Sequence, residues 1–186
     1  MARIKVIKYN EATGKLKEIY DELVSKRGKL ANVLTIQSLK PESITTHINL
    51  YMDIMFTKSE LSRAEREMMA VVVSVANKCS YCQIHHAEAV NHYWKNENKL
   101  NLLKSDFRKA DLTPKELALC IYAEEVTLNP GNSQNQDSTL LLKKERLSDN
   151  AILDATLVVS YFNFVNRMVL ALDVKLESDS GTGYKY

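Results

Sequence analysis

The stretch Asn77-Lys78-Cys79-Ser80-Tyr81-Cys82-Gln83-Ile84-His85-His86 decides the fold, because it interrupts the most apolar part of the chain with a run of reactive side chains. Two cysteines lie three positions apart, and His86 follows the second cysteine by four. Glu67 precedes the first cysteine by twelve positions. Asn77-Lys78 reads as a helix break, so the sequence predicts two helices that fold back on each other as a hairpin, the second starting at or just before Cys79.

The first helix of this hairpin has a clear start signal. Ser62-Arg63-Ala64-Glu65 has the pattern of a capping box, with a serine N-cap and a glutamate three positions later. From Met68 to Ala76 the helix is apolar on nearly every side, which predicts a central and buried position. We expect the second helix to run to about Trp94.

The rest of the chain also favours helices. Only 5 Gly and 3 Pro occur among 186 residues, fewer than a sheet-rich fold with many tight turns usually needs. Apolar spacing and start signals such as Thr113-Pro114-Lys115-Glu116 predict further helices over residues 11–27, 30–39, 41–55, 100–109, 114–128, 138–146 and 149–174. We therefore expect one all-α domain over residues 1–176 and a polar, flexible tail over residues 177–186.

One internal similarity stands out. Residues 61–77 align without gaps to residues 147–163, and the identities include Val72-Val73-Ser74 against Val158-Val159-Ser160. A duplicated helix pair would explain the similarity, and so would two buried, capped helices that draw on the same few residue types. In the second segment apolar residues stand where the cysteines, His86 and Glu67 stand in the first.

Charge and composition exclude several classes of function. The net charge of +2 is too small to favour nucleic acid or an anionic membrane as a partner. No apolar run reaches the length of a membrane span, and the N-terminus lacks an apolar signal region, so we expect a cytoplasmic protein. In that compartment three cysteines are expected to be working thiols or buried apolar groups, not structural disulfides.

The spacing of the motif predicts a proton relay. Cys79, Cys82 and His86 share one face of a helix, whereas His85 points about 100° away. A hairpin turn at the break would bring Glu67 beside His86, where a carboxylate fixes the imidazole tautomer. His86 could then deprotonate a thiol of the cysteine pair, which could reduce a peroxide and close to a disulfide.

Two physical effects compete over which cysteine attacks. The positive end of the helix dipole favours Cys79, the more N-terminal thiol. His86 lies one turn from Cys82 but about 10 Å from Cys79, and a general base acts only within hydrogen-bond reach or through one water. We therefore expect Cys82 to attack and Cys79 to resolve the product.

The pattern Glu-x11-Cys-x2-Cys-x3-His resembles the active-site motif of AhpD-like alkylhydroperoxidases, in the carboxymuconolactone decarboxylase superfamily. The flanks Ser62-Arg63-Ala64-Glu65-Arg66-Glu67-Met68 and Tyr161-Phe162-Asn163-Phe164-Val165-Asn166-Arg167 are similar to its peroxidase-related branch, and the likeness covers residues 30–174. AhpD itself has a histidine directly before its second cysteine, where this chain has Tyr81.

The resemblance implies an all-helical AhpD-like fold that forms homotrimers or homohexamers. It also implies a peroxidase that reduces hydroperoxides through Cys79 and Cys82, assisted by Glu67 and His86, without a cofactor or metal. An external dithiol of the lipoyl or thioredoxin type would regenerate the enzyme. The alternatives are a thiol-disulfide oxidoreductase and a non-catalytic, redox-responsive assembly protein. Decarboxylation belongs to superfamily members without the cysteine pair.

Several residues keep two interpretations. Tyr81 and His85 either line the pocket or cover it, and His47, His85 and His92 are more typical of a surface than of a ligand set. Asn163, Asn166 and Arg167 satisfy helix ends, form a subunit contact or line the pocket. Cys120 lies on the apolar stripe of its helix, which predicts a core position. The cysteine pair could also be plain core residues, or zinc ligands with His86 and Glu67.

Overall fold

The computed structural model describes residues 2–131 and 137–177, and every regular element in those two ranges is helical, as predicted. The elements in chain order are η1 (Tyr9–Glu11), α1 (Gly14–Arg27), α2 (Asn32–Thr35), α3 (Pro41–Phe56), α4 (Arg63–Ala76), α5 (Ser80–Trp94), α6 (Glu97–Asp106), η2 (Phe107–Lys109), α7 (Pro114–Leu128), α8 (Leu140–Lys144) and α9 (Asp149–Leu172). The expected flexible tail lies outside the described residues, apart from Glu177.

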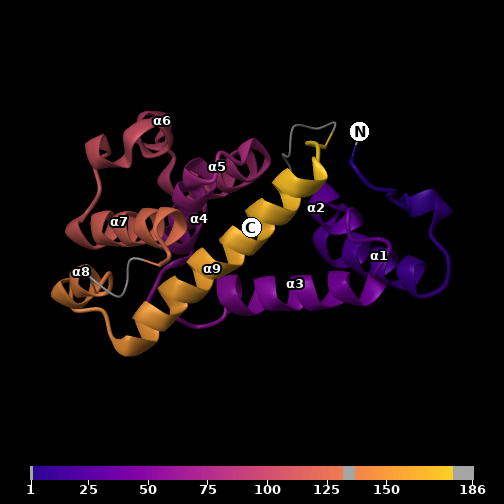
Figure 1. The fold of residues 1–186 in the computed structure, drawn as a ribbon, viewed down its shortest axis with the longest axis horizontal. Helices are drawn as coiled ribbons and strands as arrows, with labels where there is room; N and C mark the ends of the chain where they lie inside the picture. The colour runs from indigo at the N-terminus through magenta and orange to yellow at the C-terminus, as the bar shows by residue number, and fades with distance from the viewer. Residues whose placement is uncertain (1, 132–136, 178–186) are drawn as a thin grey trace.

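Helix α4 is the central helix of the fold. It packs against α5, α6, α7 and α9, and Figure 1 shows α4 to α8 on one side, α1 to α3 on the other, and α9 running diagonally between them. The side chains of residues 68–73 are all buried, as the apolar sequence predicts. Burying a large apolar side chain contributes about 1.5–3 kcal/mol, so this one helix anchors the main core.

The start of α4 has the predicted capping box. The backbone N–H of Glu65 donates to Oγ of Ser62 at 3.2 Å, and the N–H of Ser62 donates to Oε2 of Glu65 at 2.7 Å. Two N–H groups that the helix cannot satisfy are paired in this way, which fixes where α4 begins. The residues on its first two turns therefore have a defined direction, and Glu67 is among them.

A tight turn joins α4 to α5. Asn77 ends α4, Lys78 takes a left-handed conformation with φ 58°, and the N–H of Cys79 donates to the carbonyl of Ser74 at 2.8 Å. Cys79 is the N-cap of α5, one position before its first helical residue. The predicted hairpin is thus present, and it lays α5 along α4.

Helix α9 covers the hairpin. By length and composition α9 could cross a membrane, but the core helix of a globular protein passes the same test, and α9 packs on α3, α4 and α7. Its N-cap, Ser148, matches Ser62 of α4, in line with the internal similarity. Beyond Asn163 the likeness ends: α9 continues unbroken to Leu172, whereas α4 stops at Asn77 and turns back. The second segment is therefore not a second hairpin.

The N-terminal helices form a smaller core of their own. Leu16, Ile19, Tyr20 and Leu23 of α1 pack on Ile44 of α3. Gly28 ends α1 as predicted, with a left-handed φ of 81° and its N–H bound to the carbonyl of Val24. Helix α3 in turn packs against α9, which connects this smaller core to the rest of the molecule.

Some predicted boundaries are displaced by a few residues. α6 begins at Glu97 and not at residue 100, because the side chain of Asn96 accepts the N–H of Lys99 and caps the helix. α9 ends at Leu172 and not at residue 174, because Asp173 is left-handed with φ 54°. These signals lie in polar stretches where apolar spacing gives no information.

Candidate active site

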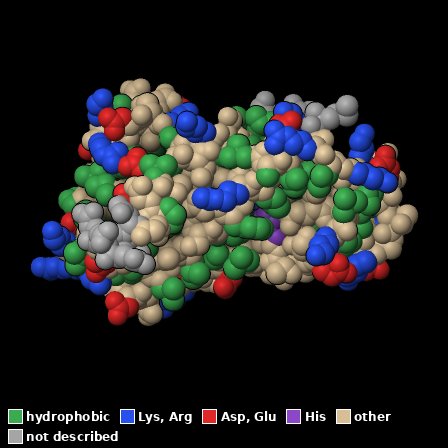
Figure 2. Space-filling view, viewed as in Figure 1, with side chains coloured by type: hydrophobic (Ala, Val, Ile, Leu, Met, Phe, Trp, Pro, Cys, Tyr) green, Lys and Arg blue, Asp and Glu red, His purple; other side chains and the backbone are tan. Residues whose placement is uncertain are grey.

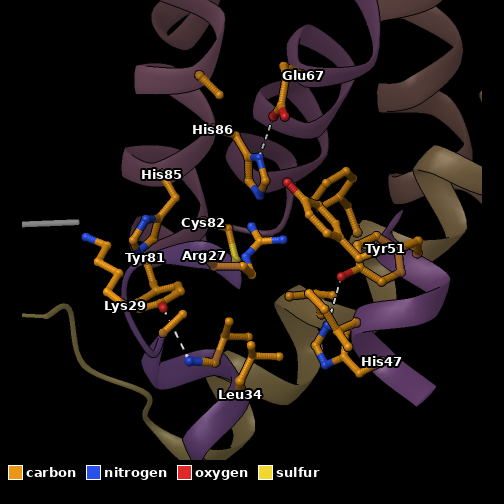
Figure 3. Close-up of a pocket in the computed structure, with 17 residues that line it drawn as sticks. Arg27, Lys29, Leu34, His47, Tyr51, Glu67, Tyr81, Cys82, His85 and His86 are labelled. Carbon is orange, nitrogen blue, oxygen red and sulfur yellow. Dashed lines mark hydrogen bonds and ion pairs between the residues drawn. The ribbon is translucent and has the colours of Figure 1, made fainter. Parts of the chain in front are cut away.

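A pocket of about 100 Å³ lies where α1, α2, α3, α5 and α9 meet. Apolar and aromatic side chains form most of its wall, and the reactive side chains Cys82, His85 and His86 come from α5 (Figure 3). Tyr81 of α5 also lines the pocket, and the other polar lining comes from α1, α3, α4, α9 and the loop after α1: Arg27, Lys29, His47, Tyr51, Glu67 and Tyr161. Small, mostly apolar cavities with a few convergent polar groups are typical of ligand sites.

The two cysteines of the motif are neighbours but face different surroundings. Both are buried, at 0% and 1% exposure, and only Cys82 lines the pocket. A hydrogen bond with Cys82 and the N–H groups of Cys82 and Tyr81 lower the pKa of Cys79. The same hydrogen bond, with burial, raises the pKa of Cys82. The pair therefore ionises first at Cys79, while the sulfur that a pocket ligand meets is Cys82.

Glu67 and His86 meet across the hairpin. Oε2 of Glu67 lies 2.6 Å from Nδ1 of His86, and Nε of Arg63 donates to Oε1 of Glu67 at 2.9 Å. Burial would raise the pKa of Glu67, but His86 and Arg63 lower it overall, so the carboxylate is ionised and only accepts hydrogen bonds. Nδ1 of His86 must then carry a proton.

In the neutral imidazole this tautomer places the lone pair on Nε2, which is the nitrogen that can act as a base. The ring packs edge-on against Phe162, with centroids 4.4 Å apart, and its side chain is 15% exposed. Figure 3 shows His86 and Cys82 turned toward the same pocket. The carboxylate of Glu67 thus orients an imidazole that lines the same pocket as the Cys82 thiol.

His47 is not on the surface, which corrects the expectation from the sequence. It is 5% exposed and joins Gln37 to Tyr161: Nε2 of Gln37 lies 2.6 Å from Nδ1, and Nε2 of His47 lies 2.8 Å from the Tyr161 hydroxyl. Burial lowers the pKa of His47 to about 4, so the ring is neutral near pH 7. The sequence offered no signal for this, because α3 alone does not show what α9 brings to it.

A second cluster closes one side of the pocket. The Tyr81 hydroxyl donates to Oε1 of Glu177 at 2.7 Å, and Nε2 of His85 lies 3.0 Å from Oε2 of the same carboxylate. The N–H of Asn32 also donates to Glu177, at 2.7 Å. His85 thus lines the pocket from beside His86 and is partly covered by Glu177, a residue that polarity alone had placed in the C-terminal tail.

The three polar residues of α9 have structural partners outside the pocket. Asn163 accepts a hydrogen bond from Asn77 at 3.0 Å, and Asn166 donates to Oγ of Ser74 at 3.4 Å. Arg167 donates to the carbonyl of Asn163. Asn163 and Asn166 thus bond the side chains of Asn77 and Ser74 near the end of α4, and none of the three lines the pocket.

Cys120 and the proposed zinc ligands can also be placed. Cys120 is fully buried on α7, as predicted, and burial raises the pKa of its thiol far above the usual range. Within residues 2–131 and 137–177, no three His, Cys, Asp or Glu side chains are grouped so that they could hold a metal ion. Glu67 is instead occupied by His86 and Arg63.

Known proteins share the fold, and a family model matches the part of the chain that contains the motif. The model of the carboxymuconolactone decarboxylase family matches residues 41–125, which include the whole Glu67–His86 motif. The crystal structure of an alkylhydroperoxidase AhpD core, an uncharacterized peroxidase-related protein from Ralstonia eutropha JMP134, has a TM-score of 0.84 at 22% identity. That alignment covers 97% of this chain and 94% of the other.

Two further structures are similar over nearly the whole chain. An uncharacterized peroxidase-related protein from Silicibacter sp. TM1040 has a TM-score of 0.81 at 26% identity, with 97% of each chain covered. A cysteine-to-alanine variant of the debrominase Bmp8, in complex with 2,3,4-tribromopyrrole, has a TM-score of 0.78 at 18% identity and covers 97% of this chain and 96% of that one. The family model therefore matches the part of the chain that carries the motif, and these structures show that the chain has the all-helical AhpD-like fold.

Proposed function

We propose that this protein is a thiol-dependent peroxidase that reduces organic hydroperoxides through Cys82 and Cys79. The observation that carries the proposal is the position of Cys82: the residue is 1% exposed and lines a small, mostly apolar pocket. A base held by a buried carboxylate lines the same pocket. A small peroxide fits this setting, since the pocket admits only small molecules.

The first step is the attack on the peroxide. His86 takes the thiol proton of Cys82, and the resulting thiolate attacks the terminal oxygen of R–O–O–H. The O–O bond breaks, Cys82 becomes sulfenic acid, and the leaving alkoxide takes the proton from His86 to give the alcohol. Glu67 stabilises the imidazolium that exists between these two transfers.

The second step closes the disulfide. Cys79, which already has the lower pKa of the pair, attacks the sulfur of Cys82, and hydroxide leaves as water with the remaining thiol proton. A dithiol reductant then exchanges with the disulfide, so that the reductant becomes the disulfide and both cysteines return to thiols. The cycle consumes one hydroperoxide and one dithiol and produces one alcohol, one water and one oxidised reductant.

The burial of both sulfurs favours a slender reductant. A lipoyl-type dithiol on a flexible arm needs less opening of the α4–α5 turn than a folded thioredoxin does, so we propose a lipoyl-type donor first and a thioredoxin-type donor second. The proposed cycle needs a supply of reduced thiols, which the cytoplasm maintains, so we propose a cytoplasmic location. A homotrimer or homohexamer is proposed for the assembly, and the exposed apolar face of α9 supports it.

The competing proposal is a thiol-disulfide oxidoreductase or a redox-responsive assembly protein. Burial of Cys79 and Cys82 applies to all three proposals, so turnover of a peroxide with a dithiol donor is what separates the peroxidase from the other two. The debrominase of similar fold shows that a related scaffold accepts a halogenated pyrrole, so a halogenated aromatic compound is worth including among the compounds assayed.

The deciding experiment measures turnover. Wild-type protein with dihydrolipoamide and cumene hydroperoxide should consume peroxide, and Cys82→Ser should not. Cys120→Ser serves as the matched control, because it removes a buried thiol that lies outside the pocket. Wild-type protein that consumes no organic hydroperoxide with either dithiol donor would refute the proposal.

A further inference from the structure

Arg27 brings a positive charge to the pocket. Arg27, in the last turn of α1, lines the pocket, and its guanidinium carbon lies 5.3 Å from the centre of the Tyr51 ring. The one hydrogen bond that it makes within the described residues is a weak contact at 3.6 Å with Sδ of Met52. No carboxylate of the described residues pairs with it, whereas Arg63, the neighbouring arginine, is neutralised by Glu67.

Tyr161 lines the same pocket, and the hydrogen bonds of its hydroxyl group follow from those of Gln37 and His47. Nε2 of Gln37 donates to the carbonyl of Val33 at 3.0 Å, which fixes the orientation of this amide. The same nitrogen lies 2.6 Å from Nδ1 of His47, so Nδ1 must accept and Nε2 of His47 must carry the proton. That proton is donated to the hydroxyl oxygen of Tyr161 at 2.8 Å.

The hydroxyl proton of Tyr161 therefore has no acceptor within residues 2–131 and 137–177. Burial raises the pKa of Tyr161 well above its usual range, so the group keeps its proton, and the nearby charge of Arg27 opposes that rise. An O–H group that keeps its proton and already accepts one hydrogen bond still has its proton to donate to a ligand. Arg27 and Tyr161 consequently add one cation and one hydrogen-bond donor to the lining of the pocket that Cys82 also lines.

We infer that Arg27 and Tyr161 form a carboxylate-binding subsite, and that the pocket takes small organic acids with an apolar body. The apolar lining, including Val33, Ile48 and Phe162, would hold the body of such an acid beside Cys82. If the protein is a peroxidase as proposed, its substrate class is a hydroperoxide that also carries a carboxylate. Only this assignment of the substrate rests on the proposed function. Arg27 and Tyr161 bind its charged end and leave the hydroperoxide group to Cys82 and His86.

The test measures binding and needs no turnover. Benzoate and benzamide have nearly the same size and differ in charge, so titration calorimetry with each reports the charge preference of the pocket. Benzoate should bind the wild-type protein at least about tenfold more tightly than benzamide, because a hydrogen bond to a charged group is worth about that factor or more. Equal affinity for the two probes, or no benzoate binding at millimolar concentration, would overturn the inference.

Variants of the lining residues test which side chains cause the preference for benzoate over benzamide. Arg27→Gln and Tyr161→Phe should each weaken benzoate about tenfold while leaving benzamide unchanged, and Arg27→Lys should keep part of the preference and show that the site still folds. Lys26→Gln is the matched control, since it removes an exposed cation of the same helix that pairs with Glu22. A benzoate preference that survives Arg27→Gln, or that Lys26→Gln removes to the same extent, would contradict the subsite.

Turnover of a matched pair links this subsite to the reaction. A hydroperoxy acid should have a higher kcat/KM than its methyl ester in the wild-type protein, and Arg27→Gln should remove the difference. Protein that binds benzoate but consumes neither peroxide would refute the peroxidase proposal and leave the subsite in place. Protein that consumes both peroxides equally would leave the peroxidase proposal in place and refute the subsite.

Discussion

The carboxylate of Glu67 meets Nδ1 of His86 at 2.6 Å across the α4–α5 hairpin, with no exposure to solvent on the carboxylate side. This contact sets the tautomer of the imidazole. Replacing Glu67 by Gln presents an amide that can donate to Nδ1, which moves the ring proton to Nε2 and removes the base from the pocket.

We therefore expect Glu67→Gln to slow the first oxidation step by about 10²- to 10⁴-fold, the usual contribution of a positioned base. Stopped-flow measurement of single-turnover thiol oxidation checks this value. Glu124→Gln, on α7 and paired with exposed Arg108, is the control for loss of one carboxylate. A folded Glu67→Gln protein with the wild-type rate would remove the pair from the mechanism.

The assignment of the two cysteines predicts a specific trapping result. Since only Cys82 lines the pocket, Cys79→Ser should accumulate sulfenic acid on Cys82 when peroxide is added. Cys82→Ser should show little modification, although Cys79 has the lower pKa of the pair, because its sulfur does not face the pocket. Mass spectrometry with a sulfenic-acid probe gives the answer, and the opposite pattern would mean that charge outweighs access.

Disulfide formation should spare the third cysteine. Cys120 lies on α7, away from the pocket, and burial raises the pKa of its thiol, so little thiolate is available to react. Mild peroxide should remove two titratable thiols per chain and link Cys79 to Cys82. Peptide mapping that finds Cys120 in the disulfide would show that the cysteines move further than this fold allows.

Glu177 should make the stability depend on pH in the acid range. Burial would raise the pKa of its carboxyl, but hydrogen bonds from His85, the N–H of Asn32 and Tyr81 lower it from 4.5 to about 2. The ionised group therefore stabilises the fold above pH 4.5, and this contribution is lost as the pH falls through about 2.

Glu177→Gln should accordingly reduce the free energy of unfolding by about 2 kcal/mol at pH 7, the size of a hydrogen bond to a charged group, and by much less near pH 2.5. Urea unfolding at the two pH values measures the difference. Glu18→Gln, at a side chain that is 71% exposed, should change the stability little at either pH. An equal loss at both pH values for Glu177→Gln would show that the carboxylate charge contributes nothing.

The outer face of α9 predicts self-association. Leu153, Leu157 and Phe164 lie on one side of this helix and are 56%, 41% and 49% exposed, and Figure 2 shows apolar side chains gathered along the middle of this face of the molecule. An exposed apolar row of this kind is typical of an interface. We expect light scattering to give a multiple of the chain mass of 21.2 kDa, and the double change Leu157→Glu and Phe164→Glu to lower it.

The control for this experiment is Leu128→Glu. Leu128 is 56% exposed at the end of α7, so the variant adds the same charge to an exposed leucine of another helix. It should keep the mass of the wild-type protein. A wild-type mass of one chain at micromolar concentration would refute self-association through α9.

The local part of the structure could be predicted from the sequence, because caps and breaks act within a few residues. Ser62 with Glu65, the break at Asn77 and the left-handed Gly28 each satisfy or end a helix by contacts to their near neighbours. The spacing from Glu67 to His86 then follows, since two helices joined by a tight turn must bring those positions together.

Only the tertiary structure decided what surrounds the motif. His47 on α3 and Tyr161 on α9 are 114 residues apart, and their contact exists because two separate cores place α3 against α9. Arg27 and Glu177 reach the pocket in the same way, from the end of α1 and from beyond α9. Periodicity within one helix tells which face is buried, but it does not tell which distant side chain the fold will bring to that face.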